Sequence, residues 1–215
     1  MKKKISCFVL FSFLLLLYQP AWSHPHVFVD AKLKIIIDKD NKLQKLVEDW
    51  DFDPVFSAGV IMDFAKNKKK LTEKEHEKLS KTIHNSVAYY GYFQCVKSNG
   101  KEIKIAPPYK FEVKLDKILK IHLEAKPEKP ITFERKRKYA FRVLDPTFYV
   151  NIAYKKNADI QVEGLPTYCK MKIIRPDADK VLQQDQSQYT EEFFMDPNNA
   201  SSLSMQLATR LEISC

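Results

Sequence analysis

The sequence predicts a single α+β domain, an antiparallel β-sheet or sandwich that carries a helical insertion. Short segments that alternate apolar and polar residues, separated by turn residues, predict strands over most of residues 27–174. One stretch, residues 54 to about 91, has helical spacing instead and interrupts the strands after the first hairpin. Residues 24–215 together are long enough to form one well-packed core.

Residues 1–23 have the three parts of a secretory signal peptide. Basic Met1–Lys4 is followed by the apolar run Ile5–Tyr18 and by a small-x-small sequence that predicts cleavage after Ser23. The apolar run is shorter than the roughly 20 residues of a membrane span, and an uncleaved N-terminal anchor is the alternative. We therefore expect a soluble protein that is exported to the periplasm.

The first two strands are predicted at Val27–Ile37 and Leu43–Phe52, joined by a turn cluster at residues 38–41. The acids of Asp49–Asp53 alternate with aromatic residues, so the three acids share one face of the second strand. Pro54 ends this strand.

Two helices are predicted within the insertion. The first is a short apolar helix at Val55–Phe64. The second begins with a capping box, Thr72-x-x-Glu75, and continues with apolar residues at helical spacing. Gly91 suits its C-terminal end.

The later part of the chain returns to strand patterns, including a hairpin at the turn Asn99-Gly100. Residues 176–200 are polar and predicted as a loop, and Ser201–Ser214 is predicted as a last strand or a short helix. The strands predicted between these points are Phe93–Lys97, Lys101–Ile105, Tyr109–Leu115, Ile118–Ala125, Ile131–Val143, Thr147–Tyr154, Asp159–Val162 and Cys169–Ile174.

The chain is basic, with a formal net charge of +9, or +6 without the three lysines of residues 2–4. A basic balance often indicates nucleic acid as the partner. Export argues against that partner, and the aromatic residues are not interleaved with the basic ones, so we expect no nucleic acid. A solvated surface is the simpler interpretation, with weak attraction to an anionic membrane as the second.

Three cysteines remain after removal of the signal: Cys95, Cys169 and Cys215. An oxidising compartment favours one disulfide and one free thiol. Three pairings are open, and we favour Cys169–Cys215 because it would attach the C-terminal segment to the body of the protein.

The N-terminal sequence His24-Pro25-His26 is the first candidate for metal chemistry. Cleavage after Ser23 would expose an α-amine next to two imidazoles, and both groups ligate metals once they lose a proton. Pro25 has no N–H, so the usual amino-terminal copper and nickel chelate cannot form. A brace-like arrangement, with amine and imidazole from His24 and help from His26, remains. The alternative is a flexible end with two solvated histidines.

Carboxylates are the second candidate. If the two first strands pair, Asp49 and Asp51 would lie beside the histidines, and mixed His and carboxylate ligands suit zinc, nickel, cobalt or iron. Asp145 opens the turn Asp-Pro-Thr and would add a further ligand. The competing interpretations are a solvated acidic edge for the first two and backbone capping for Asp145.

Enzyme motifs are absent from the sequence. It has no Gly-x-Ser-x-Gly, no His-Glu-x-x-His and no glycine-rich phosphate loop. We therefore do not expect an enzyme.

Three segments, His24–Ala31, Trp50–Asp53 with Phe56-Ser57, and Asp145–Tyr149, together resemble a family of bacterial exported proteins. Members of that family are labelled as the periplasmic component of an ABC-type transport system, and they tend to occur with permeases resembling nickel and cobalt exporters. The resemblance covers most of residues 24–215 and implies a role in transition-metal handling. Pro54 departs from the pattern of the family, and this chain carries no permease segment.

The leading hypothesis is a periplasmic metal-binding accessory protein of a nickel, cobalt or zinc transport system. A divalent transition metal would be bound by His24 and His26, with Asp49 or Asp51 and Asp145 completing the shell. The partner would be a separate membrane permease. The alternative is an adaptor that docks on a permease through the insertion 54–91 without binding metal, and a copper-brace oxidoreductase is the third hypothesis.

Overall fold

β1 (Val27–Ile37) is the strand around which the first sheet is built, in a computed structural model that describes residues 24–65, 70–183 and 188–215. It pairs antiparallel with β2 (Leu43–Phe52) and parallel with β8 (Val150–Ala153) and β9 (Ile160–Glu163). The two parallel strands take successive stretches of the same edge of β1. The α+β class is therefore confirmed, but this sheet is mixed rather than purely antiparallel.

The strands beyond β2 complete the first sheet, and a second sheet is antiparallel throughout. Next to β2 lies β6 (Leu119–Ala125), followed by the edge strand β5 (Lys110–Leu115). The second sheet has the order β10 (Lys170–Ile174), β11 (Arg210–Ser214), β7 (Lys138–Val143), β3 (Gln94–Ser98) and β4 (Lys101–Ile103). Asn99 and Gly100 connect β3 to β4 with φ angles of 46° and 79°, which confirms the predicted Asn-Gly hairpin.

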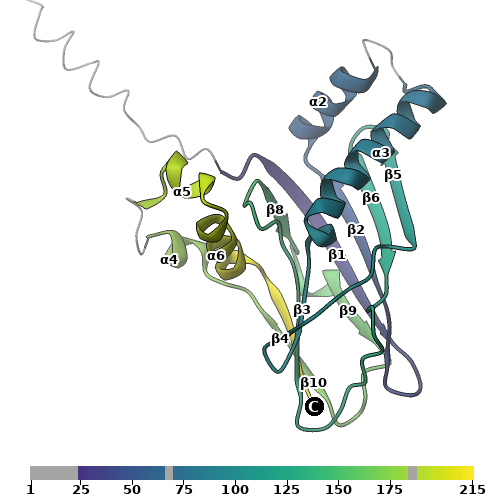
Figure 1. Cartoon of the computed structure of the whole chain (residues 1–215), viewed down its shortest axis with the longest axis vertical. Coiled ribbons are helices and arrows are strands. Elements are labelled where there is room, and N and C mark those ends of the chain that lie inside the picture. The colour runs from purple at the N-terminus through teal and green to yellow at the C-terminus, as the bar shows by residue number, and fades with distance from the viewer. Residues whose placement is uncertain (1–23, 66–69, 184–187) are drawn as a thin grey trace, which may run out of the picture.

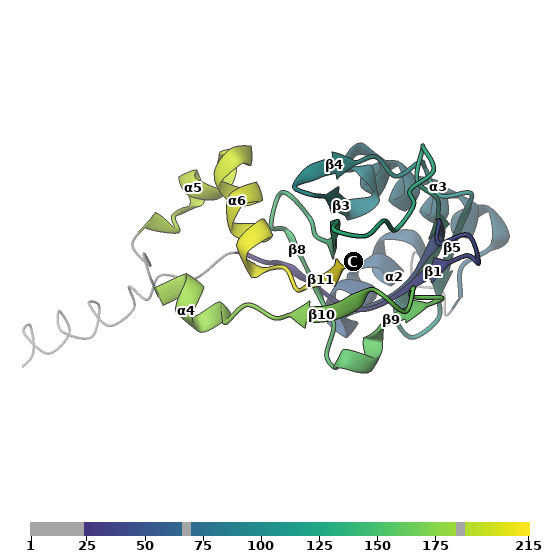
Figure 2. The same cartoon turned by 90° about the horizontal axis from the view of Figure 1, so that it is seen from below.

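The inner faces of the two sheets share one apolar core (Figures 1 and 2). Every second residue of β1 is buried, from Val27 to Ile37, because side chains of a strand alternate between its two faces. The largest fully buried side chains come from both sheets, from α3 and from the segment before β7, and they include Trp50, Leu79, Phe133, Tyr139, Leu211 and Ile213.

The predicted helical insertion is confirmed as α2 (Pro54–Ala65) and α3 (Glu73–Tyr89). The capping box forms as expected: the Glu75 amide donates to Thr72 Oγ1 at 3.3 Å, and the Thr72 amide donates to Glu75 Oε2 at 2.8 Å. Leu79 and Val87 bury the inner stripe of α3 in the core. A short 3-10 turn, η2 (Gly91–Phe93), then leads into β3.

One long strand was predicted at Ile131–Val143, and this was wrong. Only Lys138–Val143 is a strand, because a turn with φ 65° at Lys136 precedes it. The Tyr139 hydroxyl holds this turn by donating to the Thr132 carbonyl at 2.6 Å and accepting from the Glu134 amide at 3.0 Å.

The predicted loop at 176–200 was also wrong, because the segment contains α4 (Ala178–Gln183), α5 (Glu191–Met195) and the start of α6 (Pro197–Leu207). Thr190 and Asp196 cap α5 and α6 with their side-chain oxygens. The three helices lie at one end of the molecule and form a small second core with Phe148. α6 ends at Leu207 and β11 begins at Arg210. Ser201–Ser214 therefore contains both the end of a helix and a strand.

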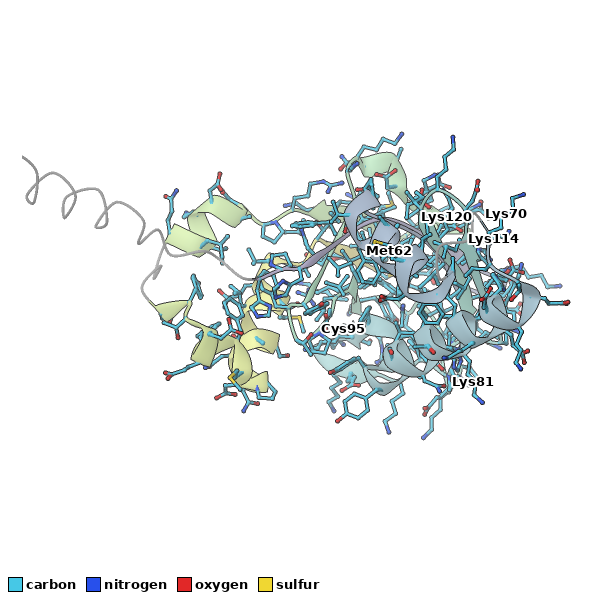
Figure 3. The ribbon with its side chains drawn as sticks, turned by 90° about the horizontal axis from the view of Figure 1, so that it is seen from above. Met62, Lys70, Lys81, Cys95, Lys114 and Lys120 are labelled. Carbon is cyan, nitrogen blue, oxygen red and sulfur yellow. A yellow bond between two sulfur atoms is a disulfide. The ribbon has the colours of Figure 1, made fainter. Side chains whose placement is uncertain are left out.

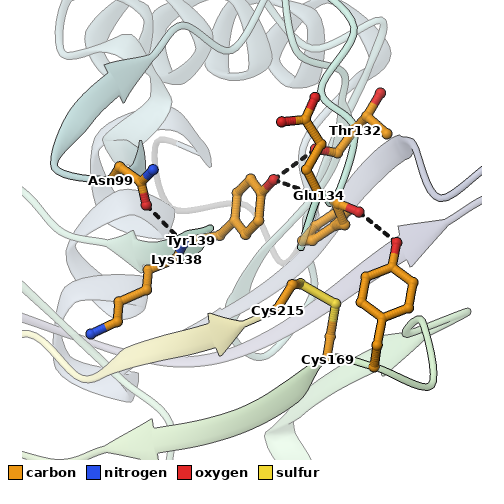
Figure 4. Close-up of a disulfide and its surroundings, with 9 residues drawn as sticks. Asn99, Thr132, Glu134, Lys138, Tyr139, Cys169 and Cys215 are labelled. Carbon is orange, nitrogen blue, oxygen red and sulfur yellow. Dashed lines mark hydrogen bonds between the residues drawn. A yellow bond between two sulfur atoms is a disulfide. The ribbon is translucent and has the colours of Figure 1, made fainter. Parts of the chain in front are cut away.

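The favoured disulfide, Cys169–Cys215, is confirmed and joins residues 46 positions apart (Figure 4). It joins Cys215, the residue after β11, to Cys169, the residue before β10, while Cys95 stays a partly buried free thiol. The predicted signal peptide, residues 1–23, lies outside the described residues. None of the helices in residues 24–65, 70–183 and 188–215 is long and apolar enough to span a membrane.

Replacing Cys169 and Cys215 together by serine should lower the free energy of unfolding by about 4 kcal/mol. The cross-link removes loop-closure entropy from the unfolded chain, and a separation of 46 residues gives that magnitude. Urea unfolding of the double variant and of the matched control Cys95→Ser measures the effect. Equal loss in the control would show that the thiols, and not the cross-link, matter.

Glu48 is a fully buried carboxyl on the inner face of β2, with 1% of its surface exposed. Trp50 Nε1 donates to one carboxyl oxygen at 2.8 Å and Gln94 Nε2 donates to the other at 2.6 Å. Burial still dominates and raises the pKa of Glu48 from its ordinary 4.5 to about 7. The neighbouring Tyr154 hydroxyl is buried without a hydrogen-bond partner among the described residues.

This pKa shift predicts that the fold becomes less stable as pH rises from about 4.5 to 7. In that window the native state keeps a proton that the unfolded state has released. The free energy of unfolding therefore falls as pH rises, by about 3 kcal/mol in total. Chemical unfolding of wild type and of Glu48→Gln at a series of pH values tests this. The variant should lose this part of the pH dependence, whereas the exposed control Glu102→Gln should keep it.

Candidate functional site

The first residues of the described chain lie against the loop that precedes β8. The amides of His26 and Val27 both donate to the carbonyl oxygen of Tyr149, at 3.0 and 3.2 Å. Val27 then opens β1 in register with Val150. The parallel pairing of β1 with β8 therefore fixes where the two histidines begin.

Four aromatic rings, two of them the histidine rings, form what we call the N-terminal site. The rings of His24 and His26 are edge-to-face with centroids 4.6 Å apart. His26 lies 4.9 Å from the ring of Tyr149, and His24 lies 4.5 Å from the ring of Phe194 in α5. The two rings are therefore brought together, with His24 partly buried and His26 still exposed to solvent.

His24 presents an unusual environment for a polar side chain. Its side chain is only 12% exposed, and its Nδ1 is buried without a hydrogen-bond partner among the described residues. Its other ring nitrogen, Nε2, lies 3.9 Å from a carboxylate oxygen of Glu191. A buried nitrogen lone pair or N–H that lacks a partner is costly, and such an atom marks a place where a ligand would be favourable.

Asp145 supports the loop rather than facing the histidines. Its Oδ1 accepts from the Thr147 amide at 2.8 Å and from the Thr147 hydroxyl at 2.7 Å, and its Oδ2 accepts from the Val150 amide at 2.9 Å. Its carbonyl oxygen accepts from the Ser204 hydroxyl in α6. The capping role is thus confirmed, and this buried carboxylate shapes the loop that carries Tyr149.

Asp49 and Asp51 lie on the outer face of the first sheet, away from the histidines. β1 and β2 pair as predicted, but Asp51 lies opposite Asp30. Asp30 is four residues beyond His26, about 13 Å along an extended strand. The acid that reaches the start of β1 is Asp53, whose Oδ2 accepts from the Phe28 amide at 3.0 Å.

Both outer-face acids have basic partners. Asp51 pairs with Lys120 at 2.9 Å, and Asp49 contacts His122 Nδ1 at 2.8 Å. They line a shallow hollow of about 550 Å³ on the outer face, which contains both acidic and basic side chains. The adjoining Glu124 accepts hydrogen bonds from Lys45 and Tyr109, and these hold its pKa down to about 2. This surface is a network of ion pairs.

The five sequence-predicted ligands are therefore not assembled in one place. Within the described ranges, no group of three or more His, Cys, Asp and Glu side chains is arranged to hold a metal ion. The structure brings His24 and His26 together and leaves Asp49, Asp51 and Asp145 to other partners. It adds Glu191 and Phe194, which the sequence pattern did not single out because their segment has a loop-like composition.

Two comparisons with known proteins cover nearly all of this chain. Residues 9–215 match the family described as "Protein of unknown function (DUF1007)". A protein of Haemophilus influenzae described as "Uncharacterized protein" is 26% identical over 198 residues, which span 90% of this chain and 91% of the relative. The likeness therefore extends over the N-terminal site, both sheets and the C-terminal helices.

Replacing Asp145 by asparagine should lower the free energy of unfolding by about 1–3 kcal/mol. The new NH2 group would face either the Val150 amide or the Thr147 donors, which leaves a buried donor unpaired. Urea unfolding measures the loss, and hydrogen exchange at the His26 and Val27 amides reports whether the loop still holds the N-terminus. The exposed control Asp116→Asn should change neither, and unchanged exchange in Asp145→Asn would contradict the positioning role.

Proposed function

This chain belongs to the DUF1007 family of unknown function, and from that premise we propose that it is a metal-binding accessory protein of a transition-metal transport system. The ion would be nickel, cobalt or zinc, and the partner a membrane permease in the same envelope. The resemblance of its sequence motifs to exported proteins that occur with nickel and cobalt permeases supports this assignment. A disulfide in a protein of this size is also consistent with export.

The single observation that carries the proposal is the buried, unpartnered Nδ1 of His24 beside the ring of His26. Neutral imidazole is the commonest protein ligand for these ions. The ring of His24 packs at a tilt on Phe194 and that of His26 on Tyr149, so both rings are partly ordered before any ion arrives and less side-chain freedom would be lost on binding.

Glu191 favours a particular role for the two nitrogens of His24. A metal-bound histidine usually donates its other N–H to a carboxylate, which fixes the ring and its tautomer. Nε2 of His24 has a carboxylate oxygen of Glu191 at 3.9 Å, which leaves Nδ1 as the ligating atom. Nδ1 and the α-amine of the same residue would form a brace if export cleaves after Ser23, with His26 as the third donor.

The three acids of the sequence hypothesis take other parts in this proposal. Asp145 shapes the loop under Tyr149, and Asp49 and Asp51 are paired to His122 and Lys120. The binding of the ion then rests on His24 and His26, and any remaining positions would be filled by water.

Calorimetric titration of the exported protein with nickel, cobalt, zinc and copper tests the proposal, after mass spectrometry has confirmed His24 as the first residue. We expect one ion to bind per chain. Adding one residue before His24, or changing His26→Ala, should weaken binding at least about 10-fold, the loss seen even for an outer-shell partner.

His122→Ala is the matched control, because His122 also contacts a carboxylate but lies on the outer sheet face. Its affinity should equal that of the wild type. Binding no tighter than millimolar for all four ions would sink the proposal, and so would equal losses in His26→Ala and His122→Ala. Preference for copper with turnover of an external reductant would instead favour the copper-brace oxidoreductase.

A second candidate, the adaptor without metal, is favoured by the outer side of α2. This helix has one charged residue, Asp63, yet Val55 and Met62 are 83% and 74% exposed. A helix that is apolar all round is normally buried. Figure 3 shows Met62 on the outward side of α2, and a Cβ added at Gly59 would meet no atom within 4 Å.

The inner side of α2 is firmly anchored, so its exposed face is not a loosely folded segment. Asp53 Oδ1 accepts from the amides of Val55 and Phe56, and the Ser57 hydroxyl accepts from the Leu119 amide. The double variant Val55→Asp/Met62→Asp should keep the fold. Loss of metal transport in cells with unchanged metal binding in that variant would favour the adaptor, and unchanged transport would exclude α2 as its docking surface.

A further inference from the structure

The outer faces of the two sheets differ in how far their charges are paired. On the first sheet, lysines alternate with acids and pair with them, as in Lys34–Glu163, Lys45–Glu124 and Lys120–Asp51. Lys155 likewise pairs with Asp30. Because its cations are matched by carboxylates, this face offers little net charge to a partner.

The second sheet differs, and its register defines which side chains face outward. Tyr139 and Phe141 of β7, Leu211 and Ile213 of β11 and Val96 of β3 are buried, so the residues between them point away from the core. The outward basic residues are Lys97, Lys138, Arg142, Lys170, Lys172 and Arg210, and the outward acids are Glu102 and Glu212. We call this set the basic face.

Most cations of the basic face are uncompensated. Lys138, Lys170 and Lys172 form no ion pair with any residue that the structure describes, and Lys97 forms none either, although Glu102 lies opposite it across β3 and β4. Glu212 is bound by Arg210 at 2.7 Å, and the nearby charges of Arg142 and Lys172 also help to lower its pKa. The single carboxylate of Glu212 therefore lies near three basic residues. Arg142 keeps its Nε buried without a hydrogen-bond partner in the described chain.

The geometry of the face suits an extended anionic surface. The strands β4, β3, β7, β11 and β10 form one layer in that order, and Figure 2 labels all of them except β7. Lys97 on β3 and Lys172 on β10 lie three strand spacings apart, about 14 Å, and Lys170 is about 7 Å from Lys172 along its strand. The cations are therefore spread over a sheet rather than gathered into a pocket for one small ion.

We propose that the basic face docks the protein onto anionic phospholipid membranes, with its lysines and arginines contacting lipid phosphates. The face carries no outward aromatic side chain in β3, β7, β10 or β11, whereas single-stranded nucleic acid is bound by stacking on aromatics. The disulfide fits an exported protein and argues against cytosolic or nuclear nucleic acid as the occupant. Basic residues near such a surface are attracted within a Debye length.

Co-sedimentation of the mature protein with vesicles of phosphatidylglycerol and phosphatidylcholine, against pure phosphatidylcholine, tests the proposal. We expect binding only to the anionic vesicles, and its loss when ionic strength rises from about 0.1 M to about 1 M. The triple variant Lys97→Gln/Lys170→Gln/Lys172→Gln should bind about 100-fold more weakly, because each lysine at such a surface contributes about a five-fold factor.

The matched control is Lys32→Gln/Lys34→Gln/Lys114→Gln, which removes the same charge from the outer face of the first sheet. It should lose little affinity, and both triples should melt like the wild type and bind metal equally well. Equal losses in the two triples would overturn the proposal, since net charge alone would then drive binding. No preference for anionic vesicles, or tighter binding to duplex DNA than to vesicles, would overturn it too.

Discussion

The pairing of β1 on both of its edges is the constraint on which the rest of the structure depends. β2 takes one edge in antiparallel register, and β8 and β9 take the other in parallel. A shift of one residue would turn Val27, Val29 and Leu33 outward and is therefore strongly disfavoured. Because the register is fixed, the residues just before β1 can occupy only one place, against the carbonyl of Tyr149. The sheet therefore sets where the histidines begin, and their ring contacts with Phe194 and Tyr149 add to this placement.

Local features were well predicted because the interactions that create them lie close together in the chain. The capping box of Thr72 and Glu75, the Asn99-Gly100 hairpin and the alternation of β1 each depend on neighbours a few residues away. The Cys169–Cys215 pairing was one of three alternatives that the sequence left open, and no local pattern selects it. Short capped helices in a polar stretch were missed because α4 and α5 are too short to show a clear periodicity.

The candidate site was only half predictable, for a physical reason. His24 and His26 are adjacent in sequence, so their proximity follows from the chain itself. Which carboxylate joins them depends on the register of β2 and on the packing of α5, both of which are long-range. The sequence pattern selected Asp49 and Asp51, but the register carries them to the outer sheet face, and Glu191 arrives instead from a segment about 165 residues away along the chain.

Because the N-terminal site is built from three separated segments, ligand binding there is coupled to the packing of the C-terminal helices. Phe194 packs at a tilt against His24 and stacks on Phe148, so α5 contacts the site on one side and the second core on the other. Under the proposal, an ion held by His24 would bind this packed arrangement and by mass action would stabilise it. The loop of Asp145 belongs to the same unit through Ser204 in α6. A bound ion would therefore also stabilise α5 and α6, the helices nearest to the site.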